Sequence, residues 1–284
     1  MYNYEILKKD IEMLNPVAAE AASLGTSVMG RDIYCIKIGR GKKKAVLTGA
    51  HHGLEYITSL FLMRFADLYT QSAISGEEMF GYDVRRFFSE TTLYIVPMVN
   101  PDGVDIAVNG LDITDEFHRQ LISRVGIHSF RKVWQANANG VDLNHNYDAL
   151  WHRVVEKPSP SLFGGEFPES EPETKAICGL LRSVNADLLI CFHSQGEEIY
   201  YDFDGTEEKK SRMIAEKMAQ ASGYEVSHPT GTASYGGCKD WFIKEFGKAG
   251  FTVEMGKGKN PLPDSVINKI FEENARLIFA CIEE

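Results

Sequence analysis

Four histidine and glutamate side chains stand at the ends of predicted strands, in a pattern that suits a metal ion. His52 and Glu55 are three residues apart just after the run KAVLTG, His193 ends the run LLICF, and Glu254 ends FTV. Residues three apart on a helix point the same way, so an imidazole nitrogen and a carboxylate oxygen can converge on one ion. Two histidines and one carboxylate with a water form a catalytic zinc arrangement, and Glu254 is then free to act as a base.

Each of these residues also has an ordinary structural interpretation. A histidine that ends an apolar strand is usually a hydrogen-bonded core residue, and a glutamate after a strand is usually a solvated end or a helix cap. The conjunction of three such sites favours a metal centre, because ligands of open α/β sheets bind just beyond the carboxyl ends of the strands.

Strands alternate with helices along the chain, which indicates an α/β fold with a largely parallel sheet. The stretch 151–173 is rich in Pro, Gly and Ser and is predicted to be a long surface loop. No shift in composition marks a boundary, so residues 1–284 are expected to form a single domain. Strands are predicted at 33–38, 44–49, 91–96, 188–192 and 251–254, and helices at 5–14, 51–70, 171–183, 207–222 and 263–282.

The composition is that of an ordinary globular protein. Of 284 residues, 30 are Lys or Arg and 40 are Asp or Glu, giving a net charge of −10, which argues against nucleic acid or an anionic membrane as a partner. No run approaches the roughly 18 apolar residues of a membrane span, and the first ten residues hold no signal-like apolar region. Five widely spaced cysteines favour reduced thiols and a cytoplasmic location. The oligomeric state does not follow from these features.

Six segments, in order along the chain, resemble the zinc carboxypeptidase family. The resemblance implies a three-layer α/β/α sandwich on a mixed, mostly parallel sheet of about eight strands. It also implies one zinc ion held by His52, Glu55 and His193, with Glu254 as general base and acid. The segments are GRDIYCIKIG at 30–39, GAHHGLEYIT at 49–58, PMVNPDG at 97–103, WQANANGVDLNHNY at 134–147, FHSQG at 192–196, and GGCKDWF and FTVEMGKG within 236–258.

The same resemblance implies roles for residues around the zinc. Asp142 matches the aspartate that hydrogen-bonds the first zinc histidine and fixes its tautomer. Asn144 matches a substrate-binding asparagine. Zinc lowers the pKa of bound water towards ~7, and Glu254 takes the proton of the attacking water and passes it to the leaving amine. Pro97, Asn100, Pro101 and Gly103, within PMVNPDG, are predicted to form a structural turn without chemistry.

Two departures from the family concern groups that bind substrate oxygens. The family's arginine, which grips a terminal carboxylate, is His145 here, and an imidazole that is often neutral binds a carboxylate less strongly. The basic oxyanion donor is replaced by Gln135, an uncharged amide; Arg131 or Lys132 is an alternative donor, although both are more simply interpreted as surface charges.

Two further positions concern the substrate pocket. The family's mobile tyrosine falls at Thr232, and the nearby Tyr235 is a candidate replacement. The residue that sets side-chain preference is Lys239, which would favour an acidic side chain on the leaving residue, unless it is an exposed surface lysine.

The predicted function is hydrolysis of a peptide-type amide bond in a small peptide substrate. The sequences of these segments resemble those of the family's bacterial branch that cuts γ-D-glutamyl–diaminopimelate bonds in murein peptides such as the murein tripeptide. Three alternatives stay open: a conventional carboxypeptidase, a deacylase of N-acyl amino acids, and a zinc-binding regulator without turnover. The retained Glu254 argues against the regulator, which has no need of a base.

Overall fold

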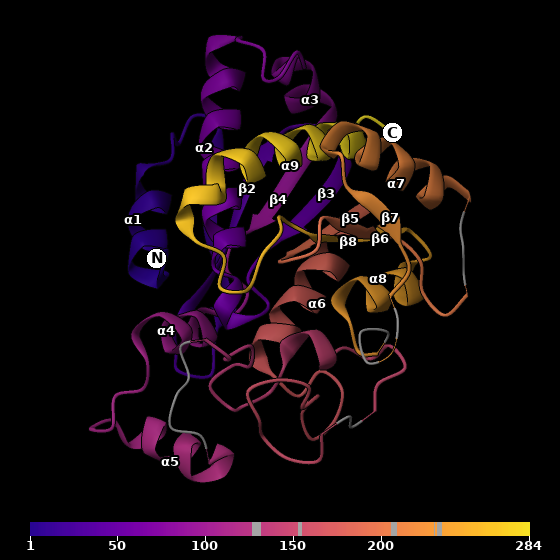
Figure 1. The fold of residues 1–284 in the computed structure, drawn as a ribbon. Helices are drawn as coiled ribbons and strands as arrows, with labels where there is room; N and C mark the ends of the chain where they lie inside the picture. Colours follow the sequence, from indigo (N-terminus) through magenta and orange to yellow (C-terminus); the bar gives the residue numbers. More distant parts are fainter. Residues whose placement is uncertain (127–131, 153–154, 206–208, 230, 232–234) are drawn as a thin grey trace.

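A mixed eight-stranded sheet runs through the middle of the computed structural model, which describes residues 1–126, 132–152, 155–205, 209–229, 231 and 235–284. The strand order is β1-β2-β4-β3-β5-β8-β6-β7, and four of the seven pairings are parallel (Figure 1). The strands are β1 (Ala19–Thr26), β2 (Asp32–Gly39), β3 (Lys43–Thr48), β4 (Thr91–Val96), β5 (Leu188–His193), β6 (Glu198–Tyr200), β7 (Glu225–Ser227) and β8 (Ala249–Glu254).

The parallel strands β3, β5 and β8 lie side by side at the centre of the sheet. All six residues of β5 are buried, as its unbroken apolar run predicts for a strand covered on both faces. The connection after β3 leads to β4 on one side, whereas β5 lies on the other side. The connections that follow β3 and β5 therefore leave their carboxyl ends in opposite directions along the sheet. α/β sheets bind ligands in the crevice between two such strands.

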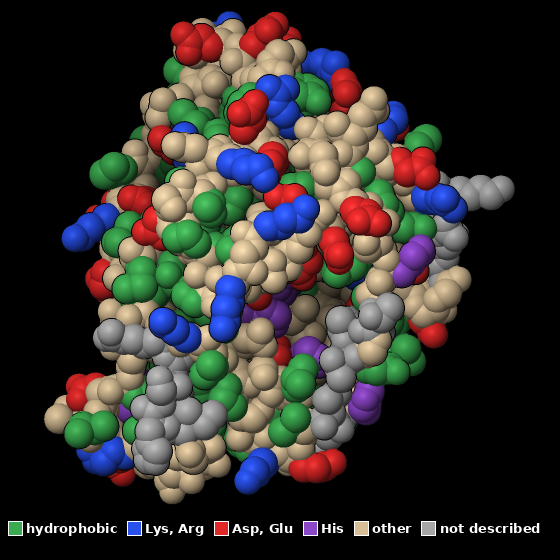
Figure 2. Space-filling view, in the orientation of Figure 1, with side chains coloured by type: hydrophobic (Ala, Val, Ile, Leu, Met, Phe, Trp, Pro, Cys, Tyr) green, Lys and Arg blue, Asp and Glu red, His purple; other side chains and the backbone are tan. Residues whose placement is uncertain are grey.

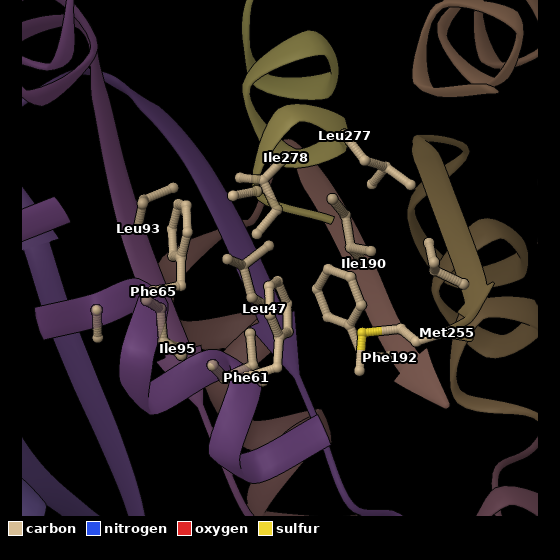
Figure 3. Packing of buried hydrophobic residues seen from close by; sticks show 14 of the residues in the cluster. Leu47, Phe61, Phe65, Leu93, Ile95, Ile190, Phe192, Met255, Leu277 and Ile278 are labelled. Carbon is tan, nitrogen blue, oxygen red and sulfur yellow. The ribbon is translucent and has the colours of Figure 1, made fainter. Parts of the chain in front are cut away.

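Helices cover both faces of the sheet and make the three layers that the family resemblance implies (Figure 1). On one face, residues of α2 and α9 pack against alternate residues of the central strands, among them Leu47, Ile190 and Phe192 (Figure 3). On the other face, α6 and α8 cover the intervening residues, such as Val46 and Leu189. The α-helices are α1 (Tyr4–Met13), α2 (Ile57–Ser75), α3 (Val84–Glu90), α4 (Pro101–Asn109), α5 (Glu116–Val125), α6 (Pro172–Val184), α7 (Lys209–Ser222), α8 (Cys238–Phe246) and α9 (Ile267–Ile282).

The predicted helix at 51–70 is wrong at its start. A short 3₁₀ turn, η1 (Gly53–Glu55), comes first, and α2 begins only at Ile57. The amides of Gly53 and Leu54 donate to the carbonyls of Gln135 and Trp134, so the segment 134–135 holds this part of the chain outside the helix. Further 3₁₀ turns within the described residues are η2 (Leu143–His145) and η4 (Asp264–Val266).

Two other predictions need correction. The turn expected at Asn100–Pro101 opens α4: the Asn100 side chain accepts from the Gly103 amide, and proline suits the first turn of a helix. The described part of the loop 151–173 lacks strands, as expected, and it enters α6 at Pro172. It does not lie wholly at the surface, because Phe163 is buried. Among the described residues, no helix has the length and apolar character to cross a bilayer.

Candidate metal centre

The site is built where three central strands end. His193 is the last residue of β5 and Glu254 the last of β8, and the two are register partners in neighbouring parallel strands. After β3 the chain runs through Gly49 to His52, which precedes the turn η1 that carries Glu55. A Cβ atom on Gly53 would lie only 2.2 Å from the carbonyl oxygen of Gly103, so glycine allows η1 to pack directly on α4.

His52, Glu55 and His193 come together as the sequence predicts. Nδ1 of His52 lies 2.9 Å from Oε1 of Glu55, and Nδ1 of His193 lies 3.1 Å from Oε2 of Glu55. The two Nδ1 atoms are 3.3 Å apart. Side chains three positions apart eclipse on a 3₁₀ turn, so the pair converges although the α-helix starts later.

The donor atoms of these three residues fit a zinc ion. Ligands at about 2.0–2.2 Å from a tetrahedral zinc lie roughly 3.3 Å from one another. Here the two Nδ1 atoms are 3.3 Å apart, and each lies 2.9 or 3.1 Å from a different oxygen of the Glu55 carboxylate. All three residues can place a ligand atom within 4.8 Å of the other two, and only His52 has a partly exposed side chain, at 13%. Two imidazoles and one carboxylate are also the donor types of a catalytic zinc site.

Electrostatics also suit a cation at this position. Burial lowers the pKa of His52, but the carboxylates of Glu55 and Asp142 outweigh it and hold that pKa well above its usual value. Burial raises the pKa of Glu55, yet His52 and His193 bring it down to about 2. His52 thus holds a proton between the ionised Glu55 and Asp142 carboxylates. A metal ion can replace that proton.

Asp142 lies behind His52 with its side chain fully buried. Its Oδ1 is 3.2 Å from Nε2 of His52, and its Oδ2 accepts the Leu162 amide at 2.9 Å and lies 3.2 Å from Nδ1 of His145. Burial opposes ionisation of Asp142, but the nearby His145 and His52 outweigh it and hold the pKa well below its usual range. The carboxylate therefore orients the His52 ring with Nδ1 towards Glu55 and His193.

Glu254 lies beside the donor cluster at the end of β8. Burial raises its pKa to about 7, and the charges of Glu55 and Glu198 act in the same direction, against the lowering effect of His193 and His52. A carboxyl group with a pKa near neutrality can both take up and release a proton, which is the property required of a general base and acid.

Three of the other predicted contact residues are held by bonds within the protein, Gln135 through its backbone only. Oδ1 of Asn144 accepts from the Cys238 amide at the start of α8, at 3.0 Å. The backbone carbonyl of Gln135 accepts from the Gly53 amide and from the Asn100 side chain. The imidazole of His145 faces Asp142.

The remaining positions lie nearer the surrounding loops. Lys239 is buried, forms an ion pair with Asp240 and donates to the Asp202 carbonyl, so the alternative of an exposed surface lysine is wrong. The ring of Tyr235 packs edge-on against His152, with centroids 4.2 Å apart. Lys132 is exposed, whereas Arg131 and Thr232 fall outside the described residues.

Sequence reasoning did not foresee the contacts that two residues make in this region. Asn100 donates to the carbonyls of His51 and Gln135, at 2.9 and 3.1 Å, and so joins the two segments beside the metal centre. Its signal, a helix-capping asparagine followed by proline, was present in the sequence. Glu198 pairs directly with Glu254 across β6 and β8, and a three-residue strand offers no pattern that predicts this pairing.

Comparison with known proteins supplies relatives along the whole chain. The model of the family "Zinc carboxypeptidase" matches residues 4–277. A gamma-D-glutamyl-L-diamino acid endopeptidase 1 from Lysinibacillus sphaericus is 36% identical over 285 residues, covering 98% of this chain and 72% of that protein. Carboxypeptidase B from Bos taurus is 26% identical over 95% of this chain and 67% of its own length.

Solved structures share the fold at lower identity. Thrombin activatable fibrinolysis inhibitor superposes with a TM-score of 0.78 at 20% identity, over 99% of this chain and 72% of that one. Murein-tripeptide amidase MpaA from Escherichia coli O157 has a TM-score of 0.58 at 21% identity, over 96% and 95% of the two chains. The α/β/α architecture is therefore that of these proteins.

Proposed function

Since the chain belongs to the zinc carboxypeptidase family and is a zinc-dependent metallopeptidase, we propose that it hydrolyses γ-D-glutamyl–diamino acid bonds in murein peptides. The γ-D-glutamyl–diaminopimelate bond is the specific target that we propose. The observation that carries this proposal is the 36% identity, over 98% of the chain, to a protein named for cleavage next to an L-diamino acid.

We assign the metal to His52, Glu55 and His193, whose donor atoms fit it. Zinc, when bound, supplies a Lewis acid and lowers the pKa of water to about 7. Glu254 takes the proton of the attacking water and donates it to the leaving amine, which its raised pKa favours. Asp142 keeps the His52 ring in position throughout.

The surroundings of His145 support a substrate other than that of a conventional carboxypeptidase. A carboxypeptidase of this family grips the terminal carboxylate of its substrate with an arginine at this position. Here the imidazole faces the buried Asp142, so its positive charge, when present, is already matched. A free terminal carboxylate of a substrate therefore gains little binding free energy at this position. This suits a peptidase that recognises other parts of its substrate.

The other proposed substrate contacts are Asn144, Gln135, Tyr235 and Lys239. Gln135 is proposed as an uncharged donor to the oxyanion, because its segment holds η1 beside the metal centre. Lys239 is proposed to favour an acidic group on the leaving residue, with the constraint that its ammonium is already paired with Asp240.

Two further proposals concern the chain as a whole. We propose that residues 1–284 act as one catalytic domain, which the family match over 4–277 supports. We propose a cytoplasmic location, which all five cysteines support because each is a free and buried thiol.

The test is product analysis on matched peptides. The enzyme is incubated with L-Ala-γ-D-Glu-meso-diaminopimelate and with blocked α-linked dipeptides, with and without a chelator, and products are identified by mass spectrometry. We expect diaminopimelate to be released from the murein tripeptide, with activity lost on chelation and restored by zinc. Good turnover of the blocked dipeptides without turnover of the tripeptide would identify a conventional carboxypeptidase instead. Absence of turnover on every peptide and on N-acyl amino acids, in zinc-loaded protein, would favour a binding protein.

A further inference from the structure

Glu198 occupies an unusual place beside the catalytic centre. It is the register partner of Glu254 across the antiparallel strands β6 and β8, and Glu254 is in turn the partner of His193 across β8 and β5. Residues directly opposite one another in a sheet present their side chains on the same face. His193, Glu254 and Glu198 therefore form a row across three strands, with the proposed base in the middle.

The side chains of the two acids are close neighbours. A Cβ atom built on Gly196 would lie 3.3 Å from Cβ of Glu254 and 3.6 Å from Cγ of Glu198, so one glycine borders both. The Tyr200 hydroxyl donates to Oε2 of Glu198 and orients the carboxylate. Glu198 is half-buried, and the described part of the chain supplies no partner for its Oε1.

A carboxylate that is already paired with a lysine is less available to a ligand. Among the described residues, the nearby lysines do not pair with Glu198. Lys257 and Lys269 both pair with the preceding residue, Glu197, at 2.9 and 2.7 Å. The neighbouring acid is thus neutralised by the chain, whereas Glu198 keeps an accessible carboxylate next to the reaction centre.

We propose that Glu198 determines specificity by binding the side-chain ammonium of the diamino acid on the leaving side of the cleaved bond. This inference rests on the proposed function, because it assumes a diamino acid in that position. Glu254 donates its proton to the leaving amine, so the Cα atom of the leaving residue lies beside Glu254. The next group in the row is Glu198.

Distances along the sheet allow this contact. Adjacent strands are about 4.8 Å apart, so the backbone of Glu198 is about 5 Å from that of Glu254 and roughly 10 Å from that of His193. The ammonium of a lysine-like side chain reaches roughly 6 Å from its own Cα. Figure 2 shows a hollow in the middle of the molecular face in view, with histidine side chains visible in it.

The test compares two peptides that differ only in the ammonium, γ-D-Glu-L-Lys and γ-D-Glu-L-norleucine. One hydrogen bond to a charged group predicts that the wild-type enzyme favours the lysine peptide in kcat/KM by about 10- to 100-fold. In Glu198→Gln the preference falls close to one, because kcat/KM falls much further on the lysine peptide than on the norleucine peptide. Glu197→Gln removes the same charge one residue away, where the lysines hold it, and keeps the wild-type preference.

Several results would overturn the inference. One is a Glu198→Gln enzyme that retains the lysine preference. Another is an equal fall in kcat on both peptides with a displaced pH profile, because Glu198 would then act on Glu254 and not on the substrate. The same comparison with α-linked peptides separates the two proposals: cleavage of α-linked peptides alone refutes the proposed function, and the lysine preference measured there still decides the role of Glu198.

Discussion

Replacement of Glu254 by glutamine separates the proposed base from the metal ligands. The strand contacts of Glu254 are made by its backbone, including the bond from the Glu197 amide to its carbonyl at 2.7 Å, so the substitution leaves β8 in place. The amide cannot accept the proton of the attacking water. Loss of general base catalysis slows reactions by about 10²- to 10⁴-fold, which corresponds to roughly 3–5.5 kcal/mol of transition-state stabilisation.

Zinc binding is expected to survive the same change. The donor atoms of His52, Glu55 and His193 contact one another and do not depend on the Glu254 carboxylate. The measurement is kcat/KM on the murein tripeptide together with zinc content by atomic absorption, in the same preparation, with Glu197→Gln as the control. A variant of wild-type activity would refute the role of Glu254, and a variant that loses its zinc would show that the donor set is wrongly assigned.

Three further substitutions test one metal ligand, the aspartate behind it, and the buried acid Glu173 in α6. His193→Ala removes one of three donors, so most of the zinc is expected to be lost on dialysis, and full occupancy would contradict the assignment. Asp142→Asn is expected to weaken zinc binding by about 10- to 100-fold in a chelator competition, with the fold retained by circular dichroism. Burial raises the pKa of Glu173 to about 8, so the folded state keeps a proton that the unfolded state releases above about pH 4.5, and stability falls as the pH rises through this interval. Between pH 6 and pH 9 this effect lowers the free energy of unfolding by roughly 3 kcal/mol, and Glu173→Gln should abolish it in urea unfolding measured across that range. If the free energy of unfolding depends on pH in the variant as it does in the wild type, Glu173 is ionised throughout.

Local patterns in the sequence were enough to find the centre of the site. The unbroken apolar run of β5 predicts a strand buried on both faces, and a histidine at its end stands out because it interrupts that run. The same holds for Glu254 after the apolar residues of β8. The pairing of His52 with Glu55 also follows from spacing alone, since residues three apart share a direction on either kind of helical turn.

The tertiary structure decided what surrounds those residues. His145 and His52 share the Asp142 carboxylate, Lys239 is buried against Asp240, and Glu198 lies opposite Glu254. These contacts depend on how strands pair and on where loops cross the edge of the sheet. Hydrophobic periodicity reports the burial of one element at a time, so it identifies a residue at the end of a strand but does not say which side chain will face it from another part of the chain.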